Sequence, residues 1–110
     1  MGLAYKANVD DMRESPALRI IEMLEALGAE VSYHDPFIPV IPRTREHATL
    51  MGRRSVPLDP GSLSAADAVL ICTDHTGVNY RAIGEHARLV VDTRNAMATA
   101  GVKGDNTVLA

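Results

Sequence analysis

The chain has 110 residues, of which 46% are apolar and 23% charged, so its length and composition fit one ordinary domain with an aliphatic core. The net charge of -3 and the lack of a lysine or arginine run exclude a general nucleic-acid binder. The apolar runs are too short to span a membrane, and no signal-peptide pattern opens the chain. We therefore expect a cytoplasmic protein, and the single cysteine fits a reducing compartment.

The first predicted element is a short apolar strand over Gly2–Lys6 that ends in a lysine. An acidic loop containing Arg13 follows, and Ser15-Pro16 then predicts a helix start. A serine hydroxyl caps the first turn, and proline suits the first helical position because no amide donor is needed there. Charged loops before helix N-termini often hold anions in α/β proteins. Lys6 and Arg13 flank this point, and both side chains can bind phosphate.

Helical spacing of apolar residues predicts a helix that begins at Pro16 and is closed by Gly28. Its apolar positions are Ala17, Ile20, Ile21, Leu24 and Leu27. Val31–His34 then predicts a short strand, which Asp35-Pro36 stops because proline disfavours a β-ladder. The order so far is β-α-β, the unit of a parallel sheet.

Five prolines and several arginines interrupt the alternation of predicted helices and strands over residues 36–60. We expect a surface excursion there, with one helical turn around 45–50. After it we expect a brief helix at 62–67, a strand at 68–72, a weak helix at 80–87, a strand at 89–92 and an edge strand within 102–110. The predicted fold is α/β, a three-layer, Rossmann-like, doubly wound and mainly parallel sheet of four to six strands.

Ligands of such sheets bind beyond the carboxyl ends of the strands. Polar residues gather at those predicted ends, namely Tyr5-Lys6, Asp35, Asp74-His75 and Arg94. Their convergence predicts a site for a nucleotide or another anion. Each residue also has an ordinary structural explanation: Lys6 as a solvated lysine, Arg13 in a surface ion pair, and His75 as a loop histidine with its hydrogen bonds satisfied.

Other chemistries find less support in the sequence. The pair Asp10-Asp11 is compatible with a metal site or a phosphoryl-accepting receiver domain, although Asp74 and Lys103 fit the remaining receiver positions poorly. The four histidines lack metal-ligand spacing. Cys72 lies in an apolar strand, which favours a packing role over a nucleophile. No glycine-rich dinucleotide fingerprint follows the first strand, and no catalytic set can be assembled, so we predict no catalytic or metal-binding residue.

Several motifs together resemble the C-terminal domain of the UDP-glucose/GDP-mannose dehydrogenase family. They cover nearly the whole chain in the family's order: Gly2-Leu-Ala-Tyr-Lys6, Asp11-Met-Arg-Glu-Ser-Pro16, Tyr33-His-Asp-Pro36, Ala66-Asp-Ala-Val-Leu-Ile-Cys-Thr-Asp-His75 and Val91-Asp-Thr-Arg-Asn95. The His-Asp-Pro and Thr-Asp-His details are most similar to the bacterial branch that acts on UDP-N-acetylhexosamines such as UDP-N-acetylmannosamine.

The resemblance implies that residues 1–110 are the UDP-sugar-binding C-terminal domain of a longer, NAD-dependent nucleotide-sugar 6-dehydrogenase for polysaccharide biosynthesis. Such enzymes oxidise the C6 alcohol of a UDP-sugar to the uronate with two NAD molecules, and the nucleophilic cysteine and NAD fingerprint belong to other domains. Carried over by motif, Tyr5, Lys6 and Arg94 bind substrate, and Arg13 approaches the NAD that the N-terminal domain holds. The isolated domain is expected to be inactive, and the full-length enzyme to be a homodimer.

The competing hypothesis is a stand-alone module without catalysis, which senses a nucleotide or binds a protein. In that case the excursion over 37–60 is the partner surface.

Overall fold

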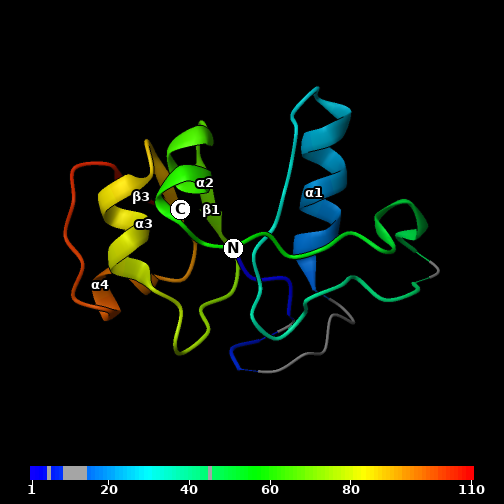
Figure 1. The fold of residues 1–110 in the computed structure, drawn as a ribbon, viewed down its shortest axis with the longest axis horizontal. Coiled ribbons are helices and arrows are strands. Elements are labelled where there is room, and N and C mark those ends of the chain that lie inside the picture. The colour runs from blue at the N-terminus through cyan, green and yellow to red at the C-terminus, as the bar shows by residue number, and fades with distance from the viewer. Residues whose placement is uncertain (5, 9–14, 45) are drawn as a thin grey trace.

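The computed structural model describes residues 1–4, 6–8, 15–44 and 46–110 (Figure 1). Its helices and strands in chain order are α1 (Pro16–Ala26), the 3-10 turn η1 (Ala48–Leu50), α2 (Pro60–Ala65), β1 (Val69–Ile71), α3 (Tyr80–His86), β2 (Val90–Asp92), α4 (Ala96–Thr99) and β3 (Thr107–Leu109). This alternation confirms the predicted α/β class. Among the described helices, none is long and apolar enough to cross a membrane.

In the described part of the chain, the sheet has three parallel strands in the order β1-β2-β3. Val69 pairs with Val90, and Val90 with Thr107, so the three strands end at one common edge. The predicted edge strand within 102–110 is confirmed as β3, and the short helix α4 was not predicted. The sheet is smaller than the predicted four to six strands, because Val31–His34 and the described part of Gly2–Lys6 are not assigned as strands.

The first residues nevertheless make strand-like hydrogen bonds on both sides. The amino group of Met1 donates to the Leu70 carbonyl (2.8 Å), and the Cys72 amide donates to the Met1 carbonyl (2.8 Å). The Gly2 amide donates to the His34 carbonyl (3.0 Å). Met1-Gly2 therefore lies between β1 and residue 34 and is hydrogen-bonded on both sides.

Helix α1 begins and ends where the sequence predicts. Ser15 accepts a hydrogen bond from the Ala17 amide, Pro16 is the first helical residue, and Gly28 adopts φ +97° just after the helix. The buried face differs from the prediction in part. Leu18 is buried, whereas Leu27 is 84% exposed, because the packed stripe follows Ala17, Leu18 and Ile21.

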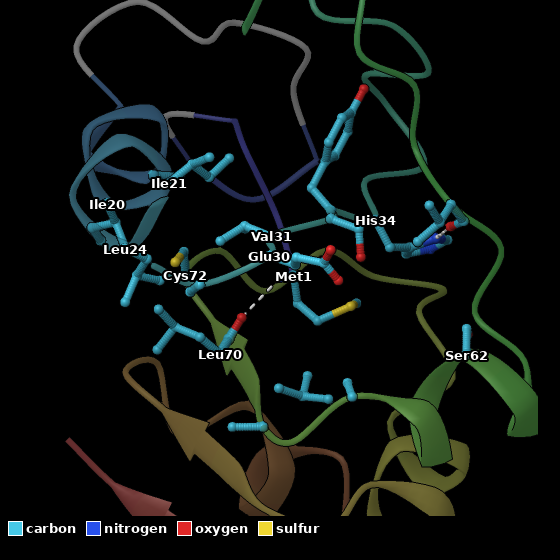
Figure 2. A pocket seen from close by; sticks show the side chains of 18 of the residues that line it. Met1, Ile20, Ile21, Leu24, Glu30, Val31, His34, Ser62, Leu70 and Cys72 are labelled. Atoms are coloured by element: carbon cyan, nitrogen blue, oxygen red, sulfur yellow. Dashed lines mark hydrogen bonds between the residues drawn. The ribbon is translucent and has the colours of Figure 1, made fainter. Parts of the chain in front are cut away.

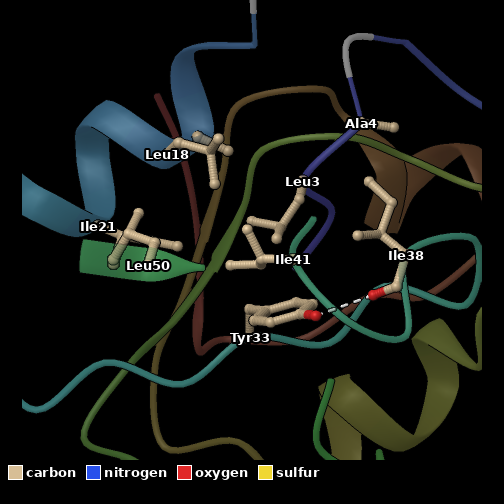
Figure 3. Close-up of a cluster of buried hydrophobic side chains, with 9 residues drawn as sticks. Leu3, Ala4, Leu18, Ile21, Tyr33, Ile38, Ile41 and Leu50 are labelled. Atoms are coloured by element: carbon tan, nitrogen blue, oxygen red, sulfur yellow. Dashed lines mark hydrogen bonds between the residues drawn. The ribbon is translucent and has the colours of Figure 1, made fainter. Parts of the chain in front are cut away.

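The buried side chains form two clusters. The first contains α1, the N-terminal segment and part of the excursion (Figure 3); its members include Leu3, Leu18, Tyr33, Ile41 and Leu50. The second joins α2, α3, α4, β1 and β2; its members include Leu63, Ile71, Ile83, Val90 and Met97. Ile71 belongs to the second cluster and the next residue, Cys72, packs against the first. Since neighbouring residues of an extended segment point to opposite sides, the end of β1 and the residue after it contact one cluster each.

The excursion between residues 37 and 60 packs onto α1 and contains the expected helical turn, η1. Arg53 makes two hydrogen bonds to the Glu25 carboxylate of α1 (2.7 and 2.9 Å), which lower the pKa of that carboxyl. Tyr33 donates its hydroxyl to the Ile38 carbonyl (2.9 Å) (Figure 3). The excursion is thus an integral part of the first cluster, and Arg53 in particular is engaged within the domain.

Candidate functional site

The carboxyl end of β2 presents Arg94 through a buried aspartate. Asp92 is 1% exposed, and its carboxylate accepts the backbone amides of Arg94 (3.0 Å), Ala96 (3.1 Å) and Met97 (2.9 Å). Between them Asn95 adopts a left-handed conformation with φ 57°, which asparagine tolerates better than most residues. Asp92 therefore fixes the turn on which Arg94 stands.

The Arg94 side chain is anchored by one of its donors. Its Nε donates to the Cys72 carbonyl (3.1 Å), and the same atom lies 3.8 Å from Oδ1 of Asp74. A guanidinium has five N–H donors in a planar fork, so four are left to bind a diphosphate or carboxylate. The side chain is 40% exposed. One N–H donor thus holds Arg94 at the end of β1. Its other four N–H donors are not used by that bond.

Lys6 lies in a loop that is tied to the same segment. Lys6 itself is exposed. On one side of it, the Ala4 carbonyl accepts the Thr73 hydroxyl (2.7 Å); on the other, Asn8 and Thr76 make two reciprocal hydrogen bonds (2.9 and 2.7 Å). The structure therefore brings the Lys6 loop and Arg94 to one stretch, residues 72–76, directly after β1. This is the convergence that the sequence predicts.

A buried aspartate–histidine pair supports the loop that carries Lys6. Nε2 of His75 lies 2.9 Å from Oδ2 of Asp35, and both side chains are at most 1% exposed. Nδ1 of His75 accepts the Asn8 amide (2.8 Å), so the proton of the ring is on Nε2 and is donated to Asp35. His75 is therefore a histidine with both nitrogens satisfied, not one aimed at a base or ribose. Its role is to hold the Lys6 loop.

Asp35 also receives three backbone amides, from Leu3 (2.7 Å), Ala4 (3.2 Å) and Phe37 (2.8 Å). Desolvation is the largest single influence on this carboxyl and would raise its pKa. The hydrogen bonds from His75, Leu3 and Phe37 together outweigh desolvation and lower the pKa of Asp35 below its ordinary value. Asp35 is consequently ionised. Its carboxylate holds residues 3 and 4, residue 37 and the His75 ring together through hydrogen bonds.

A hollow of about 300 Å³ adjoins this edge. It is lined by residues 74–78 and 80, by residues 96 and 99 of α4, and by residue 100 directly after that helix. Tyr80 donates its hydroxyl to the His75 carbonyl (3.1 Å), and burial, assisted by the charges of Asp74 and Asp92, raises its pKa to about 12. The hydroxyl therefore stays protonated as a donor, and the hollow is the available space beyond the strand ends.

The helices that follow the strands do not offer bare N-termini to an anion. Asn79 caps α3 by accepting the Ala82 amide (3.1 Å), and Asp92 accepts the first amides of α4. Among the described residues, no cluster of three metal-ligating side chains occurs. The cationic groups that the structure describes at this edge are therefore side chains, Lys6 and Arg94, and not helix N-termini.

Tyr5 and Arg13 lie outside the described residues, as does the pair Asp10-Asp11. The supporting roles of Asp35 and Asp92 were not predicted from the sequence. A signal for both exists: each aspartate ends a predicted strand and precedes a turn, where a carboxylate can accept successive amides.

Cys72 behaves as a packing residue. It is half-buried against the first cluster, and desolvation raises the pKa of its thiol. We therefore expect the thiol to react with iodoacetamide more slowly than N-acetylcysteine does at pH 8, with a pH–rate midpoint above its ordinary value of 9.0. Fast alkylation with a midpoint below that value would restore the nucleophile hypothesis.

Comparison with known proteins identifies the family. Residues 1–99 match the model of the UDP-glucose/GDP-mannose dehydrogenase family, UDP binding domain. The chain belongs to this family. The match confirms the sequence-based assignment and favours a UDP-binding domain over a stand-alone module or a receiver domain.

Individual relatives agree with the family match. The UDP-N-acetyl-D-mannosamine dehydrogenase of Pyrococcus horikoshii is 33% identical over 100 residues, which are 86% of this chain and 21% of that protein. An NDP-N-acetyl-D-galactosaminuronic acid dehydrogenase of Ralstonia solanacearum is 37% identical over 97 residues, 84% of this chain and 21% of that protein. The solved structure of the Pyrococcus enzyme superimposes with a TM-score of 0.65 at 29% identity, over 98% of this chain and 23% of that one. This UDP-binding domain therefore spans about a fifth of the length of these relatives.

Proposed function

We propose that this domain is the substrate-binding, C-terminal part of an NAD-dependent UDP-sugar 6-dehydrogenase, with a UDP-N-acetylhexosamine such as UDP-N-acetylmannosamine as substrate. The observation that carries the proposal is that Lys6 and Arg94 are presented at one edge by two buried aspartates, Asp35 and Asp92. Two cations at the edge where the parallel strands end match the charge of a diphosphate. The names of the relatives support a nucleotide N-acetylhexosamine.

In this proposal the residues of the domain bind and orient substrate and take no part in the chemical step. Arg94 offers its planar fork to the diphosphate or sugar, and Lys6 adds a point charge. Tyr5 contributes a further substrate contact from the Lys6 loop. Water is displaced from the strand ends when the substrate binds, which strengthens these charged hydrogen bonds.

The described residues do not fit an NAD site on their own. The helix after β2 has only four residues, and its first amides are already bonded to Asp92. No glycine-rich turn replaces it. NAD is therefore assigned to the remaining domains of the enzyme, with Arg13 approaching it from this one, and the isolated domain has no dehydrogenase activity. A homodimeric, cytoplasmic enzyme completes the proposal.

Calorimetric titration with UDP and UDP-N-acetylmannosamine tests the site. We expect saturable binding that Arg94→Ala and Lys6→Ala each weaken by about 1–3 kcal/mol, roughly 5- to 150-fold in Kd. NAD alone is expected to give no saturable signal.

Arg88 provides a matched control for Arg94. Its Nε also donates to a backbone carbonyl, that of Ser64 (3.1 Å), and its guanidinium also lies 3.8 Å from an aspartate, Asp67. Arg88, however, stands before β2 and Arg94 after it. Arg88→Ala should leave the affinity for UDP unchanged. Equal losses from Arg88→Ala and Arg94→Ala, or binding of NAD but not UDP, would contradict the proposed site.

A further inference from the structure

The backbone of the Lys6 loop is bonded to a buried histidine ring. The Asn8 amide donates to Nδ1 of His75 (2.8 Å), and Lys6 lies two residues earlier in the same loop. Asn8 has φ 61°, a left-handed conformation that L-residues rarely adopt, so its backbone needs contacts that hold it there. The ring of His75 holds the Asn8 backbone, and Thr76 holds the Asn8 side chain.

The bond between Asn8 and His75 exists only while the ring is neutral. A neutral imidazole has one N–H and one bare nitrogen, and here the N–H is on Nε2, which donates to Asp35 (2.9 Å). A protonated ring carries a hydrogen on both nitrogens. The new hydrogen on Nδ1 would point at the hydrogen of the Asn8 amide, so this amide must turn away from the ring. Protonation of His75 and the bond to Asn8 therefore exclude each other.

Asp35 decides which consequence of protonation is the larger. Its carboxylate is ionised and lies against Nε2, so it stabilises a positive charge on the buried His75 ring. The protonated pair has no net charge, and its direct attraction for a bound anion is correspondingly small. The movement of the loop that carries Lys6 is therefore the main effect.

The other charged or titratable groups near His75 are Asp74, Tyr80, Arg94 and the Met1 amino group. Tyr80 stays protonated, because burial raises its pKa to about 12. Asp74 is paired with Arg94 (3.8 Å). The Met1 amino group is bonded to the Leu70 carbonyl (Figure 2), and desolvation lowers its pKa below the ordinary value of 8.0. Its titration has to be separated from that of His75 by experiment.

We propose that His75 is a positioning residue for Lys6, and that protonation of its ring displaces the Lys6 loop and weakens the binding of the UDP-sugar. This inference rests on the proposed function, since it concerns the same diphosphate site. The apparent affinity falls in proportion to the fraction of molecules in which Lys6 is correctly presented. By linkage, binding of the UDP-sugar favours the neutral ring and expels the proton from Nδ1.

Calorimetric titration of the 110-residue chain with UDP-N-acetylmannosamine at pH 7.5 and pH 5.0 tests the inference, because histidines titrate in this range. The UDP-sugar is preferred to UDP, whose terminal phosphate itself titrates near about pH 6. We expect the Kd to be about 5- to 10-fold higher at pH 5.0. In the ligand-free chain, the NMR signals of the His75 ring and the Asn8 amide should titrate with one midpoint.

Two variants of the binding residues locate the origin of the pH dependence. Lys6→Ala should abolish it, because a displaced loop without the lysine has no charge to withdraw from the ligand. Arg94→Ala is the matched control. It should weaken binding at both pH values and keep the ratio between them, since Arg94 is held by Cys72 and Asp92 and not by the Lys6 loop.

Two substitutions of His75 separate positioning from structural support. An asparagine oxygen lies near the place of Nδ1 and can accept the Asn8 amide, but the side chain does not reach Asp35. A glutamine nitrogen lies near the place of Nε2 and can donate to Asp35, but leaves Asn8 without an acceptor. We expect His75→Asn to bind the UDP-sugar more tightly than His75→Gln at pH 7.5, and His75→Gln to have the higher Tm. Affinity and Tm in the same order would indicate a structural role alone and overturn the inference.

The pH series can also contradict the inference while the proposed function stands. Equal affinity at the two pH values, or tighter binding at pH 5.0, would overturn it if Arg94→Ala still weakens binding. A pH dependence that survives in Lys6→Ala would do the same, because it would come from another group such as the Met1 amino group. If the unaltered chain does not bind the UDP-sugar at pH 7.5, the proposed function fails and the inference with it.

Discussion

Replacing Asp35 with alanine is expected to lower the free energy of unfolding by about 3–5 kcal/mol, the range found when a buried, hydrogen-bonded charge pair loses one partner. The substitution removes the acceptor of the Leu3, Ala4 and Phe37 amides and of the His75 ring. Each buried donor left without a partner adds its own desolvation penalty. A domain of this size is stable by only about 5–15 kcal/mol, so the variant is near the limit of folding.

Urea denaturation followed by circular dichroism measures this loss. Asp59→Ala is the matched control, since Asp59 also accepts a backbone amide, that of Ser62 (2.7 Å), but at an exposed helix cap. The control should lose about 1 kcal/mol. If the two variants differ by less than about 1 kcal/mol, the buried network is not a main source of stability.

The same carboxylate gives a pH dependence with a defined sign. Because the pKa of Asp35 is lower in the folded state than its ordinary value of 3.8, its contribution to stability is fully present above that value. The contribution is lost as the pH falls through the lower, folded-state pKa. Asp35→Asn should therefore flatten the acid limb of a stability–pH curve and leave the slope between pH 6 and 8 as it is in the unaltered chain.

Replacing Gly2 with alanine is expected to cost about 2–5 kcal/mol. Gly2 has φ +85°, where an L-residue is strained, and a Cβ there would lie 2.5 Å from the Thr73 carbonyl oxygen and 2.9 Å from the Thr73 nitrogen. Both contacts are with backbone, which cannot turn aside as a flexible side chain can. The N-terminal segment would have to move away from β1, and with it the bonds of Met1 to Leu70 and Cys72.

Gly28→Ala isolates the effect of this close approach. Gly28 has a similar φ of +97°, but no heavy atom lies within 4 Å of a Cβ built on it. It should lose only about 1 kcal/mol, from backbone strain alone. Thermal unfolding of both variants measures the difference, and equal losses would show that Gly2 is needed for its conformation and not for its contact with Thr73.

Local signals in the sequence were sufficient for α1, α2, α3 and the three assigned strands, but not for α4. Ser15, Pro16 and Gly28 define both ends of α1 through side-chain and backbone chemistry that does not depend on the rest of the fold. The carboxyl-end rule likewise placed Arg94 at the edge where the described parallel strands end, and hydrogen bonds of Ala4 with residue 73 and of Asn8 with residue 76 bring the Lys6 loop to the same edge.

Features that depend on distant partners could not be predicted in this way. Val31–His34 has the composition of a strand, but a strand is assigned only when a ladder forms beside it, and a cavity lined by residues 28–34 and by β1 lies there instead (Figure 2). The buried face of α1 followed Leu18 and not Leu27, because the excursion supplies Ile41 and Leu50 to pack on it. The buried roles of Asp35 and Asp92 likewise depend on amides that the fold collects around each carboxylate.

The contacts of residues 1–4 have a consequence for synthesis on the ribosome. Gly2 packs against Thr73, and the carbonyl of Ala4 is bonded to the Thr73 hydroxyl, 69 positions later in the chain. At about 5–20 residues per second, the N-terminal segment waits roughly 4–14 s before its partner is made. During that interval Leu3 and α1 have only the excursion to pack against, so the first cluster can form early and the sheet must close late. The order of translation thereby separates the contacts of the two halves of the domain in time.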